Sequence, residues 1–234
     1  MAASSARRPA GEDLVAGLDE AGRGPVFGPL VLCAFAMRRD RLGELQALGV
    51  RDSKQLSGTA RERMYEPLRA LATGLAVYEL APAEIDAAPG GLDVLEAAHG
   101  AALIAAVSPR IAYVDAIGKG GALHRARLEE RLAGRDIELV VENKADDTYQ
   151  IVGAASIVAK VIRDRRLAEL DREHGPLGSG YPSDPATRAA VRRIVEAHLA
   201  TGTPLPGFVR ARWSTVARLL EPAEARKVQG ELSF

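Results

Sequence analysis

The sequence contains little of what several common protein classes require. It has one cysteine, Cys33, so no disulfide can form within the chain. No apolar run approaches the roughly 20 residues of a membrane-spanning helix, and the first residues, MAASSARRPAGED, have no apolar centre of the kind found in secretory signals. We therefore expect a cytoplasmic protein with no membrane-embedded part, in which Cys33 is a small buried hydrophobic residue.

Familiar catalytic signatures are also missing. The sequence has no Gly-x-Ser-x-Gly, no Walker loop and no Cys-x-x-Cys. The histidines lack ligand spacing, so we predict that they are surface or core residues: His99, His124, His174 and His198. Nucleophilic catalysis and a histidine metal site are therefore not indicated.

The formal net charge is +0, so bulk charge predicts no affinity for nucleic acid. The charge is unevenly placed, however. One region holds six arginines and a single acid, Glu196; the arginines are Arg188, Arg192, Arg193, Arg210, Arg212 and Arg218. Such a region either binds phosphates or is an ordinary solvated surface, and composition does not separate the two.

Apolar patterning predicts strands alternating with helices. Strands are expected over 14–19, 28–37, 74–81, 110–116 and 136–142. Helices are expected over 57–73 (with Pro67 as a candidate break), 92–107, 121–133, 148–173, 186–200 and 212–220. Asp184 followed by Pro185 is typical of a helix start. The order indicates an α/β sheet with helices on both faces, followed by a helical C-terminal part.

The stretch LDEAGRGPVFGP, residues 18–29, combines two adjacent carboxylates with a glycine-rich turn. A dinucleotide-binding loop would need a helix after the glycines, whereas an apolar strand follows, and the acids would repel a pyrophosphate. A metal site explains the pair better, because a divalent cation reverses the sign of the local field and hard oxygen ligands suit Mg²⁺ or Mn²⁺. Neighbours in a strand point to opposite faces, so both acids serve one site only if the strand ends at Glu20. The competing interpretation is a strand end with exposed acids before a hairpin turn.

Two further acids favour the metal interpretation. Asp115 ends the predicted strand IAYVD, where α/β sheets carry functional residues. Asp146 follows another strand and precedes a long helix. Each alone could be a turn residue or a helix cap. Together with Asp19 and Glu20 they could surround two cations, an arrangement that supports phosphoryl hydrolysis without a histidine base.

Several stretches together resemble ribonuclease HII, the type 2 ribonuclease H, in an archaeal-like form: GLDEAGRGPVFGPLV, RDSKQLS, YVDA, ENKADDTYQIVGAASIVAKVIRDR and GSGYPSDP. The resemblance covers residues 13–218. Ribonuclease HIII is a poorer match, since the typical chain of that family has GTG after the acids and an added N-terminal domain, whereas this sequence has GRG. The resemblance implies a ribonuclease H-like fold, a five-stranded mixed sheet flanked by helices, with a helical C-terminal extension. The expected division is a flexible tail (1–12), a catalytic domain (13–180), the extension (181–221) and a second tail (222–234).

The resemblance also implies an activity: endonucleolytic cleavage of RNA in RNA–DNA hybrids, and cleavage 5′ to a ribonucleotide embedded in duplex DNA. The implied catalytic and metal-binding acids are Asp19, Glu20, Asp115 and Asp146, holding two Mg²⁺ or Mn²⁺ ions. The implied substrate-binding residues are Gly22, Arg23 and Gly24 at the ribose 2′-hydroxyl, Tyr181 on the sugar of the next nucleotide, and Ser53 and Lys54 at backbone phosphate. Lys144 and Lys160 are candidate electrostatic partners of the acids, and the C-terminal arginines are candidates for duplex phosphates.

The end of the chain, KVQGELSF, is similar to peptides that dock on sliding clamps. Gln229, Leu232 and Phe234 carry that similarity, although the pattern is short and lacks paired aromatic residues. An ordinary tail is the alternative, and nothing in the sequence demands more than a monomer. Two other function classes remain at this stage: a non-catalytic nucleic-acid binder, and another nuclease or transposase of the same superfold.

Overall fold

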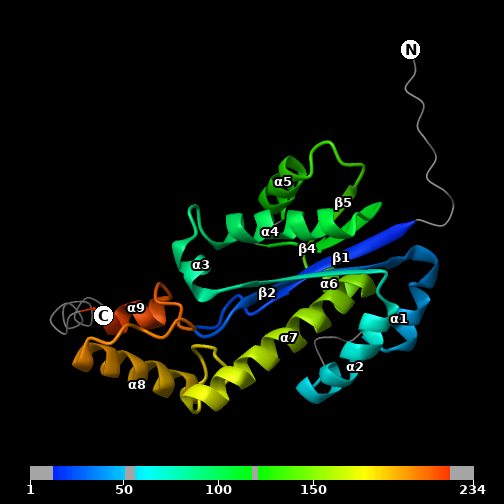
Figure 1. Cartoon of the computed structure of the whole chain (residues 1–234). Coiled ribbons are helices and arrows are strands. Elements are labelled where there is room, and N and C mark those ends of the chain that lie inside the picture. The colour runs from blue at the N-terminus through cyan, green and yellow to red at the C-terminus, as the bar shows by residue number, and fades with distance from the viewer. Residues whose placement is uncertain (1–12, 51–55, 118–120, 222–234) are drawn as a thin grey trace, which may run out of the picture. The chain divides into compact units, whose positions relative to one another are not determined.

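The computed structural model describes residues 13–50, 56–117 and 121–221. Its centre is a five-stranded sheet in the order β3-β2-β1-β4-β5. The strands are β1 (Leu14–Ala21), β2 (Leu30–Arg38), β3 (Gly74–Leu80), β4 (Ile111–Asp115) and β5 (Glu138–Glu142). Strands β1, β4 and β5 are parallel neighbours, whereas β2 runs back against β1 in Figure 1, so the sheet is mixed. This is the ribonuclease H-like sheet that the resemblance implied.

Residues on β1 alternate between two helical layers, as the pleat requires. A Cβ added to Gly17 would lie 2.2 Å from the carbonyl oxygen of Ile151, at the start of α7 (Gln150–His174). The side chain of Leu18 points the other way, because a Cβ on Gly100 of α4 (Leu92–Val107) would lie 2.9 Å from it. Asp19 shares the face of Gly17 and therefore faces α7. Figure 1 shows α4 and α7 along opposite faces of the strands.

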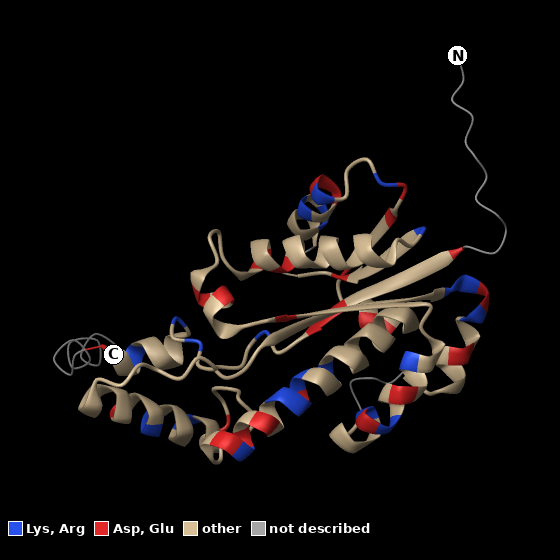
Figure 2. Cartoon of the chain, in the orientation of Figure 1, with Lys and Arg blue, Asp and Glu red and all other residues tan. Residues whose placement is uncertain are grey.

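The remaining described elements are short helices and connections. They are η1 (Arg39–Arg41), α1 (Gly43–Ala47), α2 (Gly58–Leu71), α3 (Pro82–Ala87), α5 (Ala122–Arg131), α6 (Ala145–Thr148), α8 (Pro185–Thr201) and α9 (Ser214–Leu220). Charged residues concentrate on the helices and loops, while the strands are largely uncharged (Figure 2). Cys33 is fully buried on β2, as predicted.

Most predicted elements form close to their expected bounds, and α4 has the predicted bounds of 92–107. Helix α2 continues through Pro67, so the candidate break there is wrong. Pro67 lies on the exposed side of α2, where water can bind the carbonyl that the proline leaves without an amide partner. Asp184 caps α8 as predicted, accepting a hydrogen bond from the amide of Ala186 (2.9 Å).

The chain divides into two compact units. The first contains the described parts of residues 1–20, 32–78 and 96–161, and the second those of residues 21–31, 79–95 and 162–234. The predicted boundary between residues 180 and 181 lies inside the second unit and stays a prediction.

The second unit has a hydrophobic core of its own. Three separate parts of the chain supply it: the 21–31 segment, the end of α7 with the loop after it, and the C-terminal helices. Its buried members are Val26, Phe27, Leu177, Ala190, Val191, Val195, Phe208, Val209 and Val216. An antiparallel bridge joins Phe27 to Val209. This core therefore fixes the glycine-rich segment after β1 against the C-terminal helices of the same unit.

No helix in the described part of the chain is both long and apolar enough to cross a membrane.

Candidate active site

In the first unit, Asp19 lies in a buried polar contact with α7. Its side chain is 5% exposed, and it accepts hydrogen bonds from the Ser156 hydroxyl and from the amide of Glu20, the latter at 2.8 Å. Lys160 stands one turn further along α7 and donates to the Ser156 hydroxyl at 2.7 Å. Lys160 is thus near enough to Asp19 for their charges to interact, and it also binds the serine that donates to Asp19.

Burial raises the pKa of the Asp19 carboxyl from 3.8 to about 7. The hydrogen bonds from Ser156 and Glu20 oppose that rise, the neighbouring Asp115 adds to it, and Lys160 lowers it slightly. Burial dominates because a carboxylate loses its hydration there. A buried acid at this position is costly unless a cation compensates its charge.

Asp115 lies close to this aspartate, and Asp146 follows the residue whose amide binds Asp115; all three lie in the first unit. Leu18 of β1 pairs with Val114 of β4, so Asp19 and Asp115 are the next neighbours on adjacent parallel strands. One carboxyl oxygen of Asp115 accepts a hydrogen bond from the amide of Ala145 at 2.9 Å, and Asp146 follows directly on α6. Asp146 is 5% exposed. The ends of two neighbouring strands therefore bring Asp19 and Asp115 together, and Asp146 stands one residue after the amide that Asp115 binds.

Glu20 differs from the other acids. Strand β1 extends to Ala21, two residues beyond its predicted end at residue 19 and one beyond Glu20, and Glu20 is half-buried. The pleat therefore directs its side chain to the face opposite Asp19. Its role at the same site stays a prediction.

Within residues 13–50, 56–117 and 121–221, no three carboxylate, imidazole or thiolate side chains are close enough together to form a metal site. The chemistry of the donor set nevertheless fits hard divalent cations, because every candidate ligand is a carboxylate oxygen. Like-charged carboxylates repel without a cation, and Asp115 meanwhile caps the amide of Ala145. All four predicted ligands share this oxygen chemistry, and their assignment to metal ions stays a prediction.

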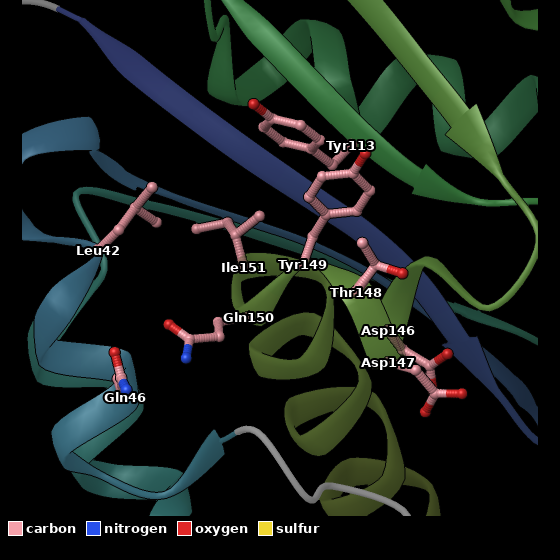
Figure 3. A pocket seen from close by; sticks show the side chains of 9 residues that line it. All are labelled: Leu42, Gln46, Tyr113, Asp146, Asp147, Thr148, Tyr149, Gln150 and Ile151. Atoms are coloured by element: carbon pink, nitrogen blue, oxygen red, sulfur yellow. The ribbon is translucent and has the colours of Figure 1, made fainter.

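A pocket of about 330 Å³ lies beside Asp146 in the first unit (Figure 3). It is lined by Leu42, Gln46, Tyr113, Asp146, Asp147, Thr148, Tyr149, Gln150 and Ile151. Tyr113 of β4 and Tyr149 pack on one another, with ring centroids 4.4 Å apart. Aromatic surfaces of this kind suit the bases and sugars of nucleic acids.

In the second unit, the Gly22-Arg23-Gly24 loop lies next to Tyr181. Gly22 has a φ of +92°, a conformation that favours glycine. A Cβ added to Gly24 would lie 3.3 Å from the Tyr181 ring, so the exposed glycine and the tyrosine adjoin. The Arg23 side chain pairs with Asp93. The structure thus brings the predicted loop and the predicted tyrosine together.

Arg163 of α7 supports this arrangement and was missed by the sequence analysis. It is 9% exposed, donates to the carbonyl of Ser179 at 2.7 Å, and its guanidinium lies 5.4 Å from the centre of the Tyr181 ring. A Cβ on Gly22 would meet its side chain at 3.2 Å. Arg163 therefore contacts both the glycine loop and the tyrosine loop. Its place in VIRDR gave no sign of burial, since arginine is mostly exposed in proteins.

Arg210 corrects one prediction. It was grouped with arginines expected to bind duplex phosphates, but its side chain is 0% exposed and cannot reach a duplex. The other five members of that group are exposed. Two of them also hold loops of their own unit: Arg188 donates to the carbonyl of Ser183 (2.7 Å) and Arg212 to that of Asp86 (2.9 Å).

Among the described residues, no three histidine, cysteine or carboxylate side chains gather as a metal site. His124 is buried and accepts a hydrogen bond from the amide of Ile117; His99 stacks on Tyr78 and His174 packs against Phe208. Predicted residues Ser53 and Lys54 lie outside the described residues, as do Gln229, Leu232 and Phe234. Lys144 is exposed with a φ of 59°, directly before α6.

A family model described as Ribonuclease HII matches residues 16–216, which include all four acids, the glycine loop and Tyr181. The chain belongs to the ribonuclease HII family. As a member of the ribonuclease HII family it is a metal-dependent endoribonuclease of the ribonuclease H type.

Individual relatives agree with this assignment. A ribonuclease HII of Aeropyrum pernix is 43% identical over 218 residues, covering 92% of this chain and 93% of the relative. The ribonuclease H2 of Pyrococcus horikoshii has a similar crystal structure, with a TM-score of 0.80 and 35% identity over 92% of this chain and 99% of that one. The ribonuclease HII in a complex with PCNA from Archaeoglobus fulgidus gives a TM-score of 0.77 at 37% identity, over 89% and 98%. The ribonuclease HII family and the ribonuclease H-like fold, both predicted from sequence motifs, are thereby confirmed.

Proposed function

We propose that this chain hydrolyses the phosphodiester on the 5′ side of a ribonucleotide embedded in duplex DNA, and RNA in RNA–DNA hybrids, leaving 3′-hydroxyl and 5′-phosphate ends. The observation that carries the proposal is the group of buried or half-buried carboxylates at the ends of β1 and β4 and on α6. Membership of the ribonuclease HII family supports the same chemistry. Replication and repair in the cytoplasm are the setting we propose.

In this proposal Asp19, Glu20, Asp115 and Asp146 hold two divalent cations. When bound, such cations lower the pKa of a water molecule and stabilise the departing oxygen. Ser156 and the amide of Glu20 both donate to Asp19 and so orient its carboxylate. Asp115 is oriented in the same way by the amide of Ala145.

The proposal assigns substrate choice to the second unit. The backbone of residues 22–24 contacts the ribose 2′-hydroxyl, the group that distinguishes RNA from DNA at one nucleotide. Tyr181, held by Arg163, packs on the sugar of the following nucleotide and favours a deoxyribose there. Ser53 and Lys54 contact backbone phosphate. A side chain at Gly24 would enter the space beside Tyr181.

The test uses an end-labelled DNA duplex with one internal ribonucleotide, with Mg²⁺, Mn²⁺ or EDTA and an all-DNA duplex as control. We expect one metal-dependent nick and no cleavage of the control. Asp115→Asn should abolish the nick and keep duplex binding. Full activity of that variant would refute the proposed site, and binding without any cleavage by the unmodified chain would favour a non-catalytic binder.

A second part of the proposal concerns a sliding clamp. A solved structure shows the Archaeoglobus fulgidus relative in complex with PCNA. We propose that this chain, as a monomer, binds such a clamp through Gln229, Leu232 and Phe234. Those residues lie outside the described chain, so the support comes from the tail sequence and from that relative.

A further inference from the structure

We propose that Arg210 is a positioning residue that orients the peptide groups of the Gly22-Arg23-Gly24 loop toward the substrate and so sets the preference for a ribonucleotide. The inference rests on the proposed function, because it explains how that loop is held for contact with a 2′-hydroxyl. Every contact that it uses lies within the second unit.

The Arg210 guanidinium is fully buried and bonded to the loop carbonyls. Nη2 donates to the carbonyl of Gly22 at 2.7 Å and to that of Gly28 at 3.0 Å. Nη1 donates to the carbonyl of Arg23 at 3.1 Å, and Nε to that of Gly28 at 3.1 Å. The Arg210 amide also donates to the carbonyl of Val26 at 2.9 Å. One side chain thus joins both ends of the turn that follows β1.

Trp213 completes the set of donors. Its indole Nε1 donates to the carbonyl of Gly24 at 3.1 Å, and its ring lies 5.0 Å from the Arg210 guanidinium. The carbonyls of three consecutive residues, 22, 23 and 24, are therefore all bonded to donors from the segment before α9.

The direction of the carbonyls fixes the direction of the amides. The described chain has no cis peptide bond, and in a trans peptide the C=O and N–H groups point to opposite sides. With the carbonyls of Gly22 and Arg23 turned to Arg210, the amides of Arg23 and Gly24 are turned away from it. Successive amides on one side of a turn form a concave group of donors for an oxygen ligand. Pro25 has no amide, so the donor group ends there.

The chemistry of arginine explains its use at this position. A planar guanidinium presents a fork of donors that can bond to several carbonyls at once, whereas an ammonium is a compact point charge. A buried cation is costly, and hydrogen bonds offset that cost. Since Arg210 is 0% exposed, it does not touch the substrate, and its influence passes through the loop.

The test measures how strongly the protein distinguishes a ribonucleotide from a deoxyribonucleotide in binding. All variants carry Asp115→Asn, which should bind without cutting. Dissociation constants are measured with Mg²⁺ for a duplex with one ribonucleotide and for the same duplex in all-DNA form, and their ratio is compared. Arg210→Met removes the fork, and Trp213→Phe removes only the donor to Gly24. Val195→Ala, in the same core but on α8, is the matched control for lost packing.

We expect Arg210→Met to reduce the ratio about tenfold and Trp213→Phe about threefold, with little change in the affinity for all-DNA duplex. Val195→Ala should keep the full ratio. If Arg210→Met does not fold, Trp213→Phe decides the matter, because its ring packing is retained. Folded Arg210→Met or Trp213→Phe proteins with the unmodified ratio would overturn the inference alone. If the Asp115→Asn protein with no further substitution binds both duplexes equally well, the proposed 2′-hydroxyl contact is overturned, and this inference with it.

Discussion

Asp19 is a buried carboxyl group whose ionisation opposes folding. Its pKa lies at about 7 in the folded protein, against 3.8 for an unperturbed aspartate. The folded state therefore holds this proton more tightly than the unfolded chain does. The free energy of unfolding should fall as pH rises through the interval between those two values, and the full loss should be present above it.

Asp19→Asn should consequently stabilise the metal-free protein at high pH. We expect the unmodified chain to lose stability between about pH 5 and about pH 8 in EDTA, and the variant to lose much less. Urea unfolding at both pH values measures this. Asp136→Asn, at an exposed position, is the control and should keep the unmodified profile. Equal pH dependence in the Asp19→Asn protein would contradict the assigned burial effect.

Gly22 and Gly24 should respond differently to the same substitution. A Cβ on Gly22 would lie 2.8 Å from the Pro29 carbonyl oxygen at a φ of +92°, so Gly22→Ala should cost about 2 kcal/mol of stability. Gly24→Ala would contact only the edge of the Tyr181 ring, at 3.3 Å. We expect the free energy of unfolding of that variant to lie within about 0.5 kcal/mol of that of the unmodified protein. Its cleavage at a single ribonucleotide should fall about tenfold or more, since the added methyl stands beside Tyr181.

Thermal melts and cleavage rates of both glycine variants check this pair. Cleavage by Gly24→Ala at the unmodified rate would contradict the proposed role of this loop, and an unmodified melting temperature for Gly22→Ala would contradict the strain expected at Gly22.

At the scale of elements, the contact between β1 and α7 fixes where Asp19 points. Gly17 has backbone of Ile151 at 2.2 Å from its ideal Cβ position, and backbone cannot turn aside as a side chain can. Gly17→Ala should therefore cost about 3 kcal/mol or more, by forcing α7 away from the strand. Gly43→Ala, where a Cβ meets no atom within 4 Å, is the matched control and should be nearly neutral. Denaturant unfolding measures the stability of both variants. A small loss of stability in Gly17→Ala would mean that α7 can move away from β1 at little cost.

Elements with long periodic patterns could be predicted from the sequence, and short ones could not. Helix α4 has a continuous apolar pattern and formed at its predicted bounds, whereas α1 and α3 were missed because five or six residues carry too little periodicity. Local propensity also failed at Pro67, where exposure to water lets α2 continue.

The site shows the same division. Motifs in the sequence singled out the four acids, the glycine loop and Tyr181 as predictions, but gave no sign of the residues that contact them. Arg163 and Arg210 are buried by packing among segments far apart in the chain, and no local pattern marks a buried arginine. Ser156 likewise gains its contact with Asp19 only from the packing of α7 on β1.

At the scale of the whole molecule, the net charge of +0 means that duplex binding depends on local groups of charge. The described arginines that are exposed between residues 188 and 218 are the candidates for phosphate contacts. Replacing Arg192 and Arg218 by Ala together should weaken binding of all duplexes alike, and reduce the slope of log affinity against log salt by about 2. Titrations at several salt concentrations measure the slope, and an unchanged slope would remove these residues from the interface.

The C-terminal tail should act independently of the catalytic site. Deleting residues 227–234 should abolish binding to a PCNA-type clamp and leave cleavage of a short free duplex unchanged. Surface plasmon resonance with the clamp, alongside the cleavage assay, tests both statements. Retained clamp affinity would exclude Gln229, Leu232 and Phe234 as the docking residues.

In the proposed reaction, the carboxylates of this chain would hold divalent cations, and contact with a 2′-hydroxyl would direct hydrolysis to the phosphodiester on the 5′ side of a ribonucleotide. The most direct measurement is the position and end chemistry of the nick in a duplex with one ribonucleotide, determined by mass spectrometry. We expect a DNA fragment ending in a 3′-hydroxyl and a second fragment beginning with the 5′-phosphorylated ribonucleotide. A cut on the 3′ side that leaves a 2′,3′-cyclic phosphate would show that the 2′-hydroxyl itself is the nucleophile, and would contradict the account.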